Sequence, residues 1–430
     1  MIQVIFVFLT LALVIFLAFR KWNIIVVSII AAGILALLSG QNILEAFTVT
    51  FATGLSGYVK NFFLLFVVSA LFGKFMEESG AAASIAKSLA RLFGQRFAIL
   101  GVLFAGMLLC YGGISALVIA FTMYPIALAV FKRADLPRRL IPGVIAAGCF
   151  TFAATCLPGT PQTINMVPIP YLSTTVSAAP VLGIICGAIG IVLTALYIYR
   201  EGAKARKKEE HFEADDATLE VLAKAETAGE GVNPFLAVVP MIVVIVLLVA
   251  FKLNAHVALL IACAVCYALF FKNIGNPMPA ILAAVQSGTG AAITTGAIVG
   301  YGSVVSASAG YAILSDAMVN MNASPLISYS LTTTVLAGAA GSGTGGLAIA
   351  LNNLAPKFIE MGISPEVLHR IGCMAATGLD SLPHNGAVVV LLTLSGMTHK
   401  DSYKQIFITT VVLTLIVCVI GILLATAGIC

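Results

Sequence analysis

The sequence DSLPHNG at positions 380–386 interrupts an apolar run, residues 367–394, that is otherwise long enough to cross a membrane. Proline removes a backbone donor and clashes with the preceding helical turn, and glycine frees the chain locally. A helix through this stretch must therefore unwind partway. A matching interruption, TCLPGTPQ at positions 155–162, lies within the apolar run 140–165 in the first half of the chain. The two interruptions predict a pair of broken helices.

The composition is that of a membrane protein. Of the 430 residues, 60% are hydrophobic and only 10% are charged, and the mean hydropathy is +1.07. Fifteen of the 41 charged residues lie between Arg200 and Glu230, so the rest of the chain has too few charges to cover a soluble surface. This excludes a soluble enzyme, a nucleic-acid-binding protein and a disordered chain. It predicts an all-α polytopic membrane protein in a lipid bilayer.

Two further apolar runs, 97–131 and 326–358, are too long for one span and barely long enough for two. Glycine and hydroxyl residues interrupt each near its middle, as YGGIS at 111–115 and SGTGG at 342–346. We expect two re-entrant hairpins. Backbone at such a tip is stable at membrane depth only where it is buried in protein or lines a water-filled cavity.

Five landmarks occur in the same order in both halves and predict an internal repeat. They pair Phe72-Gly73 with Tyr301-Gly302, Gly112-Gly113 with Gly345-Gly346, Tyr124-Pro125 with Ala355-Pro356, Leu136-Pro137 with Ser364-Pro365, and Leu157-Pro158 with Leu382-Pro383. Each half has five transmembrane helices plus one re-entrant hairpin, and five is odd, so the repeats are inverted, with the broken helices at the midplane. The predicted domains are residues 1–199 (hairpin 97–131, broken helix 140–165), a charged linker 200–232, and residues 233–430 (hairpin 326–358, broken helix 367–394).

The basic residues predict the orientation. Five crossings per half place 19 of the 23 Lys and Arg residues on one side, and only Lys60, Lys252, Lys357 and Arg370 on the other. The positive-inside rule makes the richer side cytoplasmic. Both termini are then outside and the linker is cytoplasmic. We expect the linker to be poorly ordered, because its 15 charges cannot be buried.

Paired broken helices in inverted halves predict a transport site at the midplane. Unwound backbone and helix N-termini attract an anion without a buried positive charge, and nearby hydroxyls and amides add hydrogen bonds. For a single hydroxyl, a bond back to its own helix is the simpler interpretation. The predicted substrate-binding residues are Gly112, Gly113, Ser115, Thr155, Gly159, Thr160, Ser342, Thr344, Gly345, Ser381, His384 and Asn385.

Asp380 and His384 are the predicted residues for proton or cation coupling. A carboxylate at the midplane is costly and is by default a functional hypothesis, and a histidine titrates near neutral pH. Two alternatives stay open: a carboxylate that caps the following half-helix, and a histidine that is satisfied within a proline-rich loop. No catalytic residue, metal site or cofactor is predicted.

Three stretches resemble a known family. FGKFMEESGAA at 72–82 resembles a signature of the gluconate permease (GntP) family, and LPHNGAV at 382–388 with GMTHKDSYK at 396–404 resembles its D-β-hydroxybutyrate permease branch. The family belongs to the ion transporter superfamily, so the resemblance implies inverted repeats, paired hairpins and elevator-type transport. It also implies proton symport of a small hydroxy-monocarboxylate such as 3-hydroxybutyrate, in the cytoplasmic (inner) membrane. The expected partners are the organic anion and protons, and a homodimer is compatible with this picture.

Alternatives of three kinds remain open. Gluconate or a related sugar acid is the first, since the family does not determine the hydroxy acid. A cation/proton antiporter with Asp380 as the ion site uses the same scaffold without an organic substrate. A channel or membrane sensor retains the broken helices but needs no alternating access.

Overall fold

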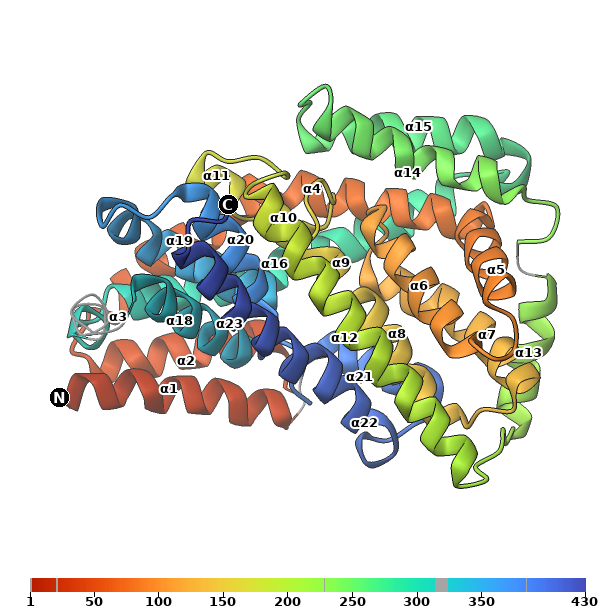
Figure 1. Cartoon of the computed structure of the whole chain (residues 1–430). Coiled ribbons are helices and arrows are strands. Elements are labelled where there is room, and N and C mark those ends of the chain that lie inside the picture. Colours follow the sequence, from red (N-terminus) through yellow and green to blue (C-terminus); the bar gives the residue numbers. More distant parts are fainter. Residues whose placement is uncertain (1, 21, 228, 314–323, 384) are drawn as a thin grey trace.

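The computed structural model describes residues 2–20, 22–227, 229–313, 324–383 and 385–430. Every regular element in these ranges is a helix (Figure 1). The helices before the linker are α1 (Ile2–Phe19), α2 (Ile24–Leu38), α3 (Ile43–Glu45), η1 (Ala46–Phe51), α4 (Ala52–Glu78), α5 (Ala81–Phe93), α6 (Ala98–Tyr111), α7 (Ala116–Ala134), η2 (Arg138–Leu140), α8 (Ile141–Cys149), α9 (Phe152–Thr155), α10 (Thr163–Met166), α11 (Ile169–Leu172) and α12 (Pro180–Lys207).

The linker and the second half continue in the same way. Their helices are α13 (Asp216–Thr227), α14 (Pro234–Val249), α15 (Ala255–Ile274), α16 (Met278–Ser306), α18 (Pro325–Ala340), α19 (Gly343–Glu360), α20 (Pro365–Ala376), α21 (Gly386–Ser395), α22 (His399–Phe407), η3 (Ile408–Val412) and α23 (Leu413–Thr426).

Six of the described helices are long and apolar enough to cross a membrane. They are α3–η1–α4, α7, α12, α15, α16 and α22–η3–α23; shorter apolar helices such as α2, α6 and α14 accompany them. The chain is therefore an all-helical, multi-pass membrane protein, as its composition predicted. Both ends of the described chain lie at the left of the molecule, and α13 lies at its right (Figure 1).

Two long helices begin well before the apolar runs that they contain. The apolar run 59–76 is the end of a continuous helix, Ile43–Glu78, and the apolar run 291–306 is the end of α16. Polar residues that end an apolar run do not end a helix when they bond to its own carbonyls, as the Thr48 hydroxyl does to the Leu44 carbonyl at 2.7 Å. Glycine also brings α16 close to α4, because a Cβ on Gly288 would lie 2.6 Å from Val67 Cα.

The hairpin and break regions form helices that match their predicted positions. α6 packs against α7 and α18 against α19, and the two pairs turn at residues 112–115 and 341–342. The helix predicted at 140–165 is broken between α8 and α10, and the helix predicted at 367–394 is broken between α20 and α21. The re-entrant character of the pairs and the inverted repeat remain predictions, since α7 alone has the length of a span.

The linker contains two helical stretches, the end of α12 and α13, which differs from the expectation of a poorly ordered connector. α12 continues to Lys207, and α13 packs against α7. Two carboxylates of the linker pair with the basic residues that follow α7, and the buried Glu201 pairs with Lys204 at 2.7 Å. Arg138 contacts both carboxylate oxygens of Asp215 at 3.1 and 3.2 Å, and Arg139 lies 2.6 Å from Glu210.

Attachment of the linker should depend on pH through Asp135, just after α7. The Phe212 N–H and the His211 ring both bond this carboxylate and lower the pKa of Asp135, while Asp135 raises the pKa of His211. The contribution of His211 to the stability of this contact is complete below the ordinary histidine pKa of about 6.5. It is lost as the pH rises through the raised pKa of His211. The contribution of Asp135 to the same stability is complete above the ordinary aspartate pKa of about 3.9. It is lost as the pH falls through the lowered pKa of Asp135.

We therefore expect protease cleavage after Lys207 or Lys208 to be slower near pH 6 than near pH 8.5, relative to cleavage of an unstructured reference peptide. The pH difference should disappear in His211→Ala. An unchanged pH dependence in that variant would show that the pair does not hold the linker.

Candidate functional site

A cavity of about 810 Å³ lies where both hairpin tips and both helix breaks meet. Six predicted site residues line it: Ser115, Ser342, Thr344, Asp380, Ser381 and Asn385. The lining also includes the apolar side chains of Phe66, Ile298, Val389 and Val390. Among the described lining residues Asp380 is the one acidic side chain, and none is Lys or Arg.

The first hairpin tip is tied to the first break by side-chain hydrogen bonds. Gln162 Nε2 donates to the carbonyls of Cys110 and Ile114 at 2.6 and 2.9 Å. In the opposite direction, the Tyr111 hydroxyl donates to the Pro158 carbonyl at 2.9 Å. The Cys110 and Ile114 carbonyls at the tip therefore have hydrogen-bonding partners in protein, which interrupted backbone at membrane depth needs.

The second tip is tied to the second break in a similar way. Asn385 Nδ2 donates to the Gly341 carbonyl at 3.0 Å, while Asn385 Oδ1 caps α21 by accepting from the N–H groups of Ala387 and Val388. Each break thus supplies one amide side chain, Gln162 or Asn385, that donates to the carbonyls of its own hairpin tip.

Asp380 joins the same tip from the other side. Its carboxylate accepts the Ser381 hydroxyl at 2.9 Å and the backbone N–H groups of Ser381 and Gly343. Gly343 is the first residue of α19, so Asp380 contacts the N-terminus of a hairpin helix. The following half-helix, α21, is capped by Asn385 instead. The alternative in which Asp380 caps the following half-helix is therefore wrong, because Asp380 contacts the N-terminus of α19 and not that of α21.

Three helices of ten or more residues begin at the cavity. Ser115 precedes α7, Ser342 precedes α19 and Asn385 precedes α21, and all three residues line the cavity. The first turn of a helix has N–H groups without intrahelical partners and carries about half a positive charge. The three helix dipoles can therefore attract an anion, although several first-turn N–H groups of α19 and α21 already bond to Asp380, Ser342 and Asn385; α7 has no side-chain cap.

Five predicted site residues pack behind the cavity wall instead of lining it. A Cβ on Gly112 would lie 1.9 Å from Met241 Cε, and one on Gly113 would lie 2.5 Å from Pro161 Cγ, so these glycines permit close packing. The Thr155 hydroxyl bonds back to Thr151, the simpler interpretation of a lone hydroxyl. The other two bond to other segments: the Gly159 N–H donates to the Val176 carbonyl, and the Thr160 hydroxyl donates to the Tyr111 carbonyl at the first hairpin tip.

Gly345 and His384 are the remaining predicted site residues. The Gly345 N–H donates to the Ser342 hydroxyl at 3.3 Å, so its backbone is used to cap α19. His384 lies outside the described residues.

Several residues that line the cavity were not among the predicted site residues. Thr294 and Thr295 on α16 line the cavity, although no motif marked them. Gln162 also lines it, and its position in the first break was the available signal. Trp22, the chain's single tryptophan, lies in the loop between α1 and α2 and lines the cavity too.

Arg370 corrects the orientation argument. It was assigned to the outer surface as one of four basic residues, but its side chain on α20 is fully buried in protein. A buried arginine is not a surface charge, so it drops out of the positive-inside comparison.

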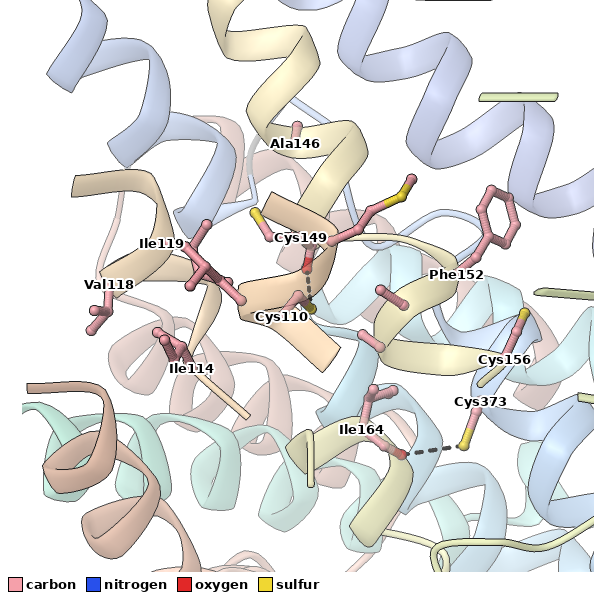
Figure 2. Close-up of a cluster of buried hydrophobic side chains, with 14 of the residues drawn as sticks. Cys110, Ile114, Val118, Ile119, Ala146, Cys149, Phe152, Cys156, Ile164 and Cys373 are labelled. Carbon is pink, nitrogen blue, oxygen red and sulfur yellow. Dashed lines mark hydrogen bonds between the residues drawn. The ribbon is translucent and has the colours of Figure 1, made fainter. Parts of the chain in front are cut away.

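Apolar and cysteine side chains of α6, α8, α10 and α20 pack beside the cavity, and Cys149 and Ile164 also line it (Figure 2). Cys110 Sγ donates to the Cys149 carbonyl at 3.4 Å, and Cys373 Sγ donates to the Ile164 carbonyl at 3.3 Å (Figure 2). Eight of the nine cysteines are buried, where a thiol acts as a small apolar side chain. Within the described ranges, no three His, Cys, Asp or Glu side chains are grouped to hold a metal.

A cavity at two helix breaks of a helical membrane protein is the architecture expected of a transport protein. Over residues 2–427, the chain matches the family described as GntP family permease. It is 33% identical to an uncharacterized transporter, YxjC, of Bacillus subtilis (strain 168), with 96% of each chain covered. An uncharacterized transporter of Haemophilus influenzae is 31% identical over 31% of each chain.

The fold is similar to that of a solved structure, the Alcanivorax borkumensis YdaH transporter, whose topology is described as unusual. The TM-score is 0.60 at 16% sequence identity, with 90% of this chain and 89% of that chain covered. The protein belongs to the GntP family of permeases, which confirms the family resemblance seen in its sequence.

Proposed function

We propose that this permease is a secondary active transporter that imports a small hydroxy-monocarboxylate, such as 3-hydroxybutyrate, together with protons. The observation that carries this proposal is the cavity wall, in which α7, α19 and α21 begin while no described lining residue is Lys or Arg. Three converging helix N-termini favour a carboxylate. The membrane is the cytoplasmic one, with both termini outside and the linker inside.

The rest of the lining supports a short acid over a sugar acid. The hydroxyls of Ser115, Ser342 and Thr344 and the amide of Asn385 suit the substrate's carboxylate and hydroxyl. Phe66, Ile298 and Val390 offer apolar contacts to a methyl group, which a sugar acid lacks. Water fills the part of the 810 Å³ that a four-carbon acid leaves.

Transport requires that the cavity open to each side in turn. The two halves share the order of hairpin, broken helix and long helix, in α6–α7, α8–α10 and α12, and again in α18–α19, α20–α21 and α22–η3–α23. This order supports two inverted repeats and elevator-type alternating access around a site at their interface.

Uptake of labelled 3-hydroxybutyrate into proteoliposomes tests the proposal. With an acidic exterior we expect accumulation above the external concentration, and an ionophore that dissipates the pH gradient should abolish it. Unlabelled 3-hydroxybutyrate should compete better than gluconate. A cation/proton antiporter would take up no organic acid, and a channel would conduct without uphill accumulation; either result would overturn the proposal.

A further inference from the structure

Arg370 on α20 is buried in a way that leaves it no capacity to bind a substrate. A guanidinium has five N–H donors. Nε donates to the Ala178 carbonyl at 3.1 Å and Nη2 to the same carbonyl at 2.8 Å; Nη2 also reaches the Val176 carbonyl at 3.4 Å. Nη1 donates to the Thr155 carbonyl and to Asn165 Oδ1, both at 3.0 Å. All five donors are therefore used on neutral oxygens.

Neighbouring residues on the same face of α20 hold the same segment of the first half. They follow the helical spacing of three and four residues. Glu366 Oε2 accepts the Ala179 N–H at 2.9 Å, and the Cys373 thiol donates to the Ile164 carbonyl. His369 lies between the Thr174 hydroxyl at 2.7 Å and Asn165 Oδ1 at 3.1 Å. One face of α20 thus binds the backbone and side chains of residues 155–179.

This contact joins the two walls of the cavity from behind. On the first-half side, the segment 155–165 includes Thr163 and Ile164, which line the cavity. On the second-half side, α20 leads into Thr377 and Asp380, which also line it. The carbonyls that Arg370 binds lie at the end of α9 and in the loop before α12, where buried backbone needs a donor from outside.

We propose that Arg370 is a positioning residue of the transport site, which fixes the two broken helices relative to each other without touching the substrate. The proposal rests on the proposed function for its substrate readout, but not for its structural readout. Arginine is suited to this role because its planar group offers five donors in a fixed geometry, whereas lysine offers three donors from one atom.

The test compares Arg370→Gln and Arg370→Lys with the wild-type chain, using full-length protein in detergent. Leu35→Ala is the matched control, because Leu35 is fully buried in α2, in the separate apolar cluster with α1 and α16. The first readout is the affinity for 3-hydroxybutyrate, from the fluorescence of Trp22. The second is amide hydrogen exchange in residues 155–179 and in the second hairpin tip, 341–346.

We expect both Arg370 variants to weaken substrate affinity by about 100-fold, since a small displacement of one cavity wall misplaces its donors. Exchange should rise in residues 155–179 and not in 341–346. Leu35→Ala should lower the melting temperature without changing affinity. Wild-type affinity in Arg370→Gln would overturn the proposal, and so would weaker affinity with unchanged exchange, because that pattern indicates direct substrate contact.

Failure of the proposed function is distinguishable from failure of this inference. If the wild-type chain does not bind 3-hydroxybutyrate, the exchange measurement decides alone: raised exchange in 155–179 supports the positioning role, and unchanged exchange overturns it. Arg370→Lys, which retains the charge, provides the same comparison if Arg370→Gln does not fold.

Discussion

Replacing Asp380 by asparagine should abolish accumulation driven by a pH gradient while substrate binding and exchange persist. Asp380 is the one acidic side chain among the described cavity-lining residues. An ionised carboxylate about 5 Å from a bound substrate carboxylate would oppose binding by about 3 kcal/mol at an effective dielectric constant near 20. A proton on Asp380 removes this repulsion, so proton and substrate bind together. Asparagine imitates the protonated form permanently.

The measurement is uptake of labelled substrate at a series of external pH values, alongside counterflow without a gradient. Asp401→Asn is the control, because Asp401 caps α22 at an exposed position outside the cavity and should leave coupling unchanged. Uphill uptake by Asp380→Asn with the wild-type pH profile would contradict the coupling role. Asp380 would then be a structural cap of α19, and His384 would be the next candidate.

Gly346→Ala should disable transport by preventing the second hairpin from packing. A Cβ on Gly346 would lie 2.3 Å from the N and Cα atoms of Ala337, on the neighbouring helix α18. These are backbone atoms, so no side chain can rotate away. Overpacking of this kind typically destabilises a protein by about 1–3 kcal/mol. Because α19 begins at the cavity, separation of α18 and α19 would also displace Ser342, Gly343 and Thr344 from the site.

We expect a lower melting temperature and loss of uptake in Gly346→Ala. Gly57→Ala is the control, since Gly57 in α4 does not line the cavity and has open space where a Cβ would project. It should retain stability and uptake. Wild-type melting and transport in Gly346→Ala would show that the helix pair tolerates separation and that its close approach is not needed for function.

The sequence predicted those parts of the site whose signals are local. Proline and glycine act on their own helix, so both breaks and both turns were found from the residues alone. Ser115, Ser342, Asp380 and Asn385 were then placed correctly at the cavity because they flank those interruptions. The cavity itself follows, since interrupted backbone at membrane depth must meet protein or water.

The features that the sequence missed depend on contacts between distant segments. Arg370 is buried because residues 155–179 fold over α20, some 200 positions away in the chain. In the sequence, Arg370 lies near the end of an apolar run, as any charged residue at the end of a span does, so its position alone does not indicate burial. The linker is held by ion pairs with Arg138 and Arg139, which composition cannot pair in advance. Thr155 and Thr160 do not line the cavity, and their hydroxyls bond to the Thr151 and Tyr111 carbonyls.

The central claim is that helix N-termini hold an organic anion in this cavity without a basic side chain. A structure of the full-length protein with bound 3-hydroxybutyrate tests it most directly. We predict density for the substrate carboxylate against the N-termini of α7, α19 or α21, beside Ser115, Ser342 or Asn385. Density for the substrate outside this cavity, or in contact with Arg370, would contradict the account.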